Sequence, residues 1–162
     1  MKELLDQINE ISKYGLIKNL NEENKEKNLE KNLVKIYNSY FEIEYEFDEN
    51  DYPEFEKTEL LNIRENIESN FPKFGFYKIA NEISEIENEY ENLIGDSIDD
   101  LTDIIFDLQE TKWRTENTSE NDAKWFYKFT FETHTKNHLI NLLNYINPVS
   151  YTHLTLPTIL LV

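Results

Sequence analysis

Apolar residues recur every three or four positions along most of this 162-residue chain, and little interrupts them. Leu4, Ile8 and Ile11 form the first such stripe, which stops at Gly15. This spacing puts apolar side chains on one face of a helix. With only three glycines and four prolines in the whole sequence, few positions can break a helix. The chain is therefore expected to fold from helices.

The stripes predict an all-α fold, a single-domain bundle of about six helices with no convincing strand. Asp96 is a good N-cap for one of these helices, with Asp99 three residues later. The expected helices span residues 4–15, 29–41, 60–71, 79–93, 96–113 and 122–147. The expected core contains Leu33, Ile36, Ile67, Ile83, Leu101, Ile105, Leu108, Trp125, Phe129 and Leu142.

The chain is strongly acidic, with 33 acidic and 16 basic residues and a formal net charge of −17. Such a charge repels nucleic acids and anionic membranes and attracts basic proteins. The absence of cysteine excludes disulfides, thiol catalysis and cysteine-ligated zinc. No stretch approaches the roughly 20 apolar residues of a membrane span. We therefore expect a cytoplasmic protein that binds neither nucleic acid nor membranes.

Residues 149–162 differ from the rest of the chain, because they contain no Lys, Asn, Asp or Glu. The stretch "VSYTHLTLPT" resembles the translation of an adapter used to build shotgun sequencing libraries, as in a bacterial metagenomic assembly. We therefore expect residues 1–148 to be the helical domain and residues 149–162 to be a non-native read-through tail. The natural C-terminus is then missing, and His153 belongs to no site.

Two sets of side chains could hold a metal ion. His134 and His138 lie four residues apart, on one face of the last expected helix. Asp100 and Asp103 belong to an acidic stripe on the helix that begins after Asp96. Together these four side chains define an alternative function, a metal-dependent hydrolase. Histidines also fill helix faces and aspartates also cap helix starts, so we expect the two faces to point apart and no cofactor to bind.

The stretch "EYEFDENDYPEFEK" alternates aromatic and acidic residues around Pro53, which favours a long connection over a strand. Its carboxylates could form a negative surface for a basic partner. We therefore expect a non-enzymatic protein-binding domain, with an immunity-type neutraliser of a basic toxin as its most concrete form. The expected partner-binding residues are Asp48, Glu49, Asp51, Glu54, Asp103 and Asp107.

At "FPKFGFYKIA", "GDSIDDLTDIIFDL" and "WFYKFTFETHTKNHLINLL" the chain resembles DUF5063, a bacterial family of unknown function. The resemblance covers most of residues 1–147 and is strongest from Phe71 onward. The family's Asp-Asp-Leu-x-Asp-Ile helix corresponds to residues 99–104, and the two histidines of its last helix correspond to His134 and His138. Thr135 stands where the family usually has Trp. The resemblance implies an α-helical fold and supplies no activity.

Overall fold

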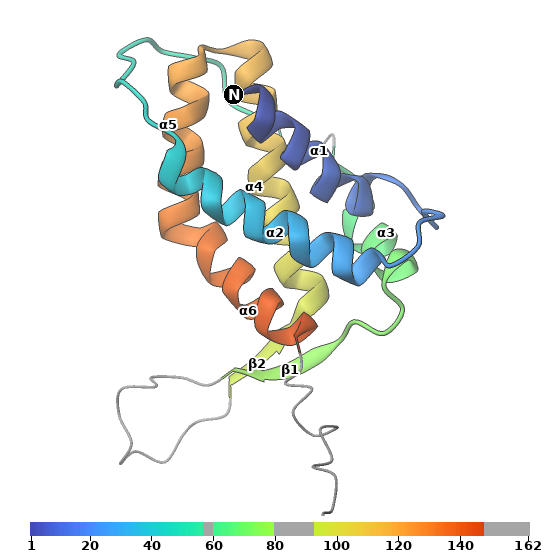
Figure 1. The fold of residues 1–162 in the computed structure, drawn as a ribbon. Coiled ribbons are helices and arrows are strands. Elements are labelled where there is room, and N and C mark those ends of the chain that lie inside the picture. The colour runs from blue at the N-terminus through green and yellow to red at the C-terminus, as the bar shows by residue number, and fades with distance from the viewer. Residues whose placement is uncertain (57–59, 80–92, 148–162) are drawn as a thin grey trace, which may run out of the picture.

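The computed structural model of the chain describes residues 1–56, 60–79 and 93–147, and these are mostly helical (Figure 1). Three of the helical segments, α5, η2 and α6, follow one another without a break, and η2 is a π-helical turn. The described residues therefore form five separate helices where about six were expected. The elements are α1 (Lys2–Leu16), α2 (Lys25–Glu42), α3 (Ile63–Asn70), β1 (Phe76–Ile79), β2 (Leu93–Asp96), α4 (Ser97–Asn117), α5 (Glu120–Thr130), η2 (Phe131–Thr135) and α6 (Lys136–Ile146).

The expectation of no strand is wrong, because β1 and β2 pair as a two-stranded antiparallel sheet. Gly75, just before β1, is held to the start of α4 by Ser97, whose hydroxyl accepts from the Gly75 amide at 2.9 Å. The helix expected over residues 79–93 has its two ends, Ile79 and Leu93, in these strands. The rest of that helix and the tail at residues 149–162 lie outside the described residues.

α4 is the central helix of the described fold and contacts α1, α3, α5 and α6. In Figure 1, α2 crosses in front of α4, and the small sheet lies beside the end of α6. α4 begins as expected, because the carboxylate of Asp96 accepts a hydrogen bond of 3.0 Å from the amide of Ile98. Arg64 on α3 pairs with the same carboxylate at 2.6 Å. These contacts fix where the acidic first turns of α4 lie.

The expected core is mostly confirmed. Of the ten expected residues, seven are buried: Leu33, Ile36, Ile67, Leu101, Ile105, Leu108 and Leu142. Ile83 lies outside the described residues. The expectation is wrong for α5, where Phe129 is 54% exposed and Trp125 only partly buried. Ala123, Tyr127 and Phe131 are buried instead, four residues apart on the adjacent face.

Buried polar groups join segments that are distant in the sequence. Asn70, at the end of α3, donates to the carbonyls of Tyr14 and Ile17 at 2.8 and 2.7 Å, and its side-chain oxygen accepts from the amide of Leu20 at 2.7 Å. A single side chain thereby binds the end of α1 and the connection that follows it. Within the described ranges, no helix combines the length and apolar character needed to cross a membrane.

Candidate metal centre

The acidic stripe of α4 faces the chain's paired histidines. Asp100, Asp103 and Asp107 are three or four residues apart and therefore share one face of α4. That face packs against η2 and α6, and Asp100 is buried. The expectation that the aspartates and histidines point apart is wrong. It failed because α4 is covered on several sides, so the face bearing the aspartates is not left to solvent.

Each histidine ring meets a carboxylate through its Nδ1 atom. Nδ1 of His134 lies 2.8 Å from a carboxylate oxygen of Asp107, and Nδ1 of His138 lies 2.8 Å from one of Asp100. A metal-binding histidine commonly donates its second ring nitrogen to a carboxylate in this way, which fixes the ring and its tautomer. Nε2 is then the atom of each ring that remains for an ion.

The third candidate ligand is Asp103, which lies between Asp100 and Asp107 on α4. Its carboxylate oxygen lies 3.5 Å from Nε2 of His138. Two ligand atoms about 2.1 Å from one tetrahedral zinc ion are ~3.4 Å apart, so this pair already has the required spacing. Ligand atoms of Asp103, His134 and His138 all lie within 4.8 Å of one another.

The π-helical turn η2 presents two consecutive residues to one carboxylate. The hydroxyl of Thr135 donates to Asp107 Oδ2 at 2.7 Å, and Nδ1 of His134 approaches the same oxygen. Consecutive side chains of a regular α-helix point about 100° apart, whereas a π turn changes this angle locally. π turns occur frequently at functional sites. The irregular turn therefore helps to place His134 over the acidic face.

The candidate ligands are more exposed to solvent than the two aspartates that contact the histidine rings. The side chains of His134 and Asp103 are 47% and 34% exposed, whereas those of Asp107 and Asp100 are 13% and 8% exposed. The hydrogen bond with Asp100 raises the pKa of His138 against the opposing effect of desolvation. Burial raises the pKa of Asp103, and the facing His138 opposes that shift. The cluster thus has a buried base of carboxylates and a ligand side open to water.

The expected partner-binding residues do not form one surface. Glu49, Asp51 and Glu54 are exposed on the connection after α2. Asp103 and Asp107 are largely buried and face the histidines, so the expectation that they lie on exposed negative surface is wrong.

Asp48 anchors the connection instead of extending from it. Its carboxylate accepts hydrogen bonds from the hydroxyls of Tyr52 and Ser119, the latter at the start of α5. Whether the exposed acids bind a partner stays a prediction.

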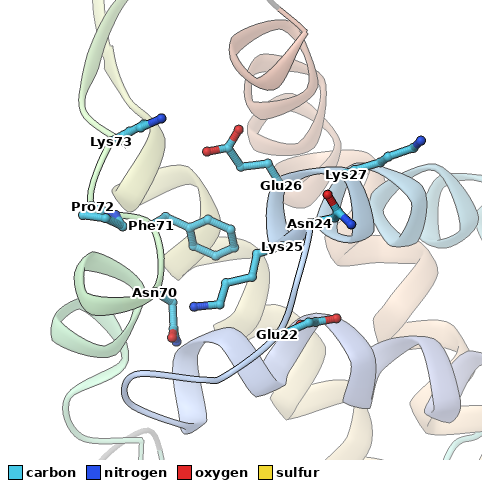
Figure 2. A pocket seen from close by; sticks show the side chains of 9 residues that line it. All are labelled: Glu22, Asn24, Lys25, Glu26, Lys27, Asn70, Phe71, Pro72 and Lys73. Atoms are coloured by element: carbon cyan, nitrogen blue, oxygen red, sulfur yellow. The ribbon is translucent and has the colours of Figure 1, made fainter.

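A hollow of about 410 Å³ lies at the start of α2, between that helix and the segment after α3. Figure 2 shows the ring of Phe71 and the amine of Lys25 turned toward this space. Lys27 and Lys73 also line it, together with Glu22 and four further residues. The hollow shares no residue with the histidine and aspartate cluster, and no sequence motif had indicated it.

No family model, curated protein or solved structure matches the chain. The resemblance to DUF5063 therefore stays a prediction, and the geometry of the cluster is what bears on function. In this helical protein, two histidines and one aspartate lie close enough together to hold one metal ion. The sequence had indicated four candidate ligands, Asp100, Asp103, His134 and His138. The structure brings three of them together and places Asp100 on Nδ1 of His138 instead. The contacts of Asp107 with His134 and Thr135 had not been expected. A repeat of aspartates matching the histidine spacing was the available signal for Asp107.

Proposed function

We propose that this protein binds one divalent transition-metal ion through Asp103, His134 and His138. The observation that carries the proposal is the 3.5 Å spacing between Nε2 of His138 and the carboxylate of Asp103, with Nδ1 of the ring turned to Asp100. Two side chains from different helices thus have the spacing of ligands, and a third carboxylate supports one of them. Two surface residues that bind no ion would not need a buried carboxylate to fix the orientation of one ring.

The chemistry of the ligands favours zinc over magnesium or calcium. Imidazole nitrogen suits zinc and its transition-metal neighbours, whereas magnesium and calcium prefer sites made of oxygen. A set of two histidines and one carboxylate occurs in catalytic zinc sites, where water takes the remaining position. Structural zinc sites instead use four protein ligands. Three ligands on the solvent-facing side of the cluster match the catalytic type.

The reaction that such a site supports is hydrolysis by a metal-activated water. A zinc ion lowers the pKa of its bound water to about 7, which supplies a nucleophile at neutral pH. Here His134, His138 and Asp103 would hold the ion, while Asp107 and Asp100 would orient the two rings. We therefore propose a metal-dependent hydrolase as the function.

Metal titration tests this proposal. The purified protein is titrated with Zn²⁺, Mn²⁺ and Mg²⁺ while its melting temperature and the heat of binding are followed. We expect zinc to bind at one ion per chain and to raise the melting temperature, since an ion at 100 times its Kd adds about 2.7 kcal/mol of stability. Asp103→Asn and His134→Ala should abolish the rise, and Asn137→Ala, an exposed neighbour, should leave it unchanged. Zinc binding that survives both ligand substitutions would contradict the assignment.

A second candidate function, binding of a basic protein, is supported by the connection after α2. Phe47 is 71% exposed and Tyr45 is 42% exposed, on a segment that also carries Glu49, Asp51 and Glu54. Exposed aromatic rings flanked by carboxylates suit a partner that is positively charged and partly apolar. An immunity-type neutraliser of a basic toxin is a protein of this kind.

A lysine-rich peptide containing tryptophan serves as the probe for this second candidate. We expect its binding to weaken with added salt and to be lost when Glu49, Asp51 and Glu54 are changed to their amides. The matched control neutralises three exposed acids elsewhere, Glu3, Glu65 and Glu116, and should bind almost as well as the unaltered protein. Equal losses in the two triple variants would indicate net charge alone and would contradict a defined surface.

A further inference from the structure

Tyr77 reaches the metal centre from the small sheet. It lies on β1, opposite Gly95 of β2 in the strand register. Its hydroxyl donates a hydrogen bond to Oδ2 of Asp100, while Oδ1 of the same carboxylate lies 2.8 Å from Nδ1 of His138. A chain of contacts therefore runs from Tyr77 through Asp100 to the ring of His138 and on to Asp103.

We propose that Tyr77 is a positioning residue for the metal centre. Its hydroxyl holds Asp100 in one orientation, and Asp100 in turn keeps the proton of His138 on Nδ1. Nε2 of His138 is then free for the ion. This inference rests on the proposed function. The side chain of Asp100 is only 8% exposed, so a carboxylate oxygen without a donor would be costly there. With Tyr77 on one oxygen and His138 on the other, both oxygens are satisfied and the carboxylate cannot turn freely.

The sheet is built to bring the ring of Tyr77 close. A Cβ atom at Gly95 would lie 2.3 Å from Cζ of Tyr77, so the phenol occupies space that any other residue would fill. The ring of Tyr145, at the end of α6, packs on Tyr77 with 5.4 Å between centroids. Burial raises the pKa of Tyr77, with Asp100 adding to the shift, and the hydroxyl therefore keeps its proton at neutral pH. These contacts give a function to the two short strands.

Two substitutions distinguish the contribution of the Tyr77 hydroxyl from that of its ring. Tyr77→Phe removes the donor and keeps the ring, whereas Gly95→Ala keeps the donor and displaces the ring. The control is Tyr145→Phe, which removes a neighbouring hydroxyl that donates to the carbonyl of Lys73 at 2.9 Å. Circular dichroism establishes that each variant is folded before binding is measured.

The first readout is zinc affinity, measured by competition with a chelator. Loss of a residue that orients a ligand typically weakens metal binding 10- to 100-fold. We expect a loss of about tenfold or more for Tyr77→Phe and Gly95→Ala, no further loss when the two are combined, and unchanged affinity for Tyr145→Phe. The visible spectrum of the cobalt-loaded protein should change in the first two variants.

The second readout needs no metal. At a pH where titration has shown the His138 ring to be neutral, nitrogen-15 spectra of the imidazole should show it protonated on Nδ1. Tyr77→Phe should shift that ring toward a mixture of tautomers. If the unaltered protein binds no zinc, the proposed function fails, and the tautomer still reports whether Tyr77 orients His138. If zinc affinity and tautomer are both unchanged in Tyr77→Phe, the positioning role is wrong while the metal site stands.

Discussion

The hydroxyl of Tyr127 donates a hydrogen bond of 2.6 Å to the backbone carbonyl of Ile36, and so joins α5 to the middle of α2. Tyr127 is 2% exposed, so water cannot replace the bond. We expect Tyr127→Phe to lower the free energy of unfolding by about 1–3 kcal/mol, the cost of a buried acceptor left without its donor. Tyr37→Phe is the control, since its hydroxyl makes no hydrogen bond to the described residues. Urea unfolding measures both, and equal effects would contradict the prediction.

The inward face of α5 and η2 is tested by two phenylalanines. Phe131 is fully buried, whereas Phe129 is 54% exposed and stacks on Trp125 with 5.5 Å between centroids. Phe131→Ala should lower the free energy of unfolding by about 3–5 kcal/mol. Phe129→Ala should cost less than about 1 kcal/mol, because little of its burial is lost. Thermal unfolding of the two variants gives the comparison. A larger loss for Phe129→Ala would show that the helix buries the face with Trp125 and Phe129 instead.

Asn70 is expected to matter more than its size suggests. Replacement by Ala leaves the amide of Leu20 and the carbonyls of Tyr14 and Ile17 without their side-chain partner. We expect a loss of about 2–3 kcal/mol and faster hydrogen exchange at Leu20. Asn21→Ala removes the same side-chain amide from the exposed residue that follows Leu20, and it should leave the free energy of unfolding nearly unchanged. Unchanged protection at Leu20 in the Asn70 variant would show that this tether is not needed.

Asp48 should make stability depend on pH in the acid range. Hydrogen bonds from Ser119, Tyr52 and the amide of Asn50 lower its pKa to about 2. A pKa that is lower in the folded state adds stability above the unfolded value, and that stability disappears as the pH falls from about 4 to about 2. Unfolding by urea along this range should show the unaltered protein losing its advantage over Asp48→Asn. Asp51→Asn, which removes an exposed charge, should follow the unaltered protein instead.

The parts of the fold that the sequence predicts well are those with one dominant signal. α1 and α2 follow single apolar stripes, and α4 has both a stripe and an N-cap at Asp96. The strands could not be predicted, because four residues hold too few alternations to be recognised. In α5 two apolar stripes compete, one through Trp125 and Phe129 and one through Tyr127 and Phe131. Packing against α2 and α4 selects between them, and single-sequence spacing carries no information about that packing.

The candidate site shows the same division. The spacing within the aspartate stripe and within the histidine pair is local and visible in the sequence. Their convergence depends on how α4 packs against η2 and α6, which is a long-range property of the bundle. The contact of Tyr77 was harder still to predict, since Tyr77 reaches Asp100 only because β1 pairs with β2 at Gly95. Local patterns thus indicated the candidate ligands, and tertiary structure determined that they meet.

The π-helical turn at Phe131–Thr135 has a consequence for how the sequence can change in length. A π turn amounts to one residue more than the same rise of α-helix needs, so losing one residue there would leave an unbroken helix. Each residue of an α-helix contributes about 100° of rotation, and His138 would then turn away from Asp100 while α5 kept its position. A deletion of Thr133, an exposed residue, would therefore separate His138 from Asp100 without interrupting the helix. A homologue one residue shorter in this turn would lose the contact between His138 and Asp100 even where both histidines remain.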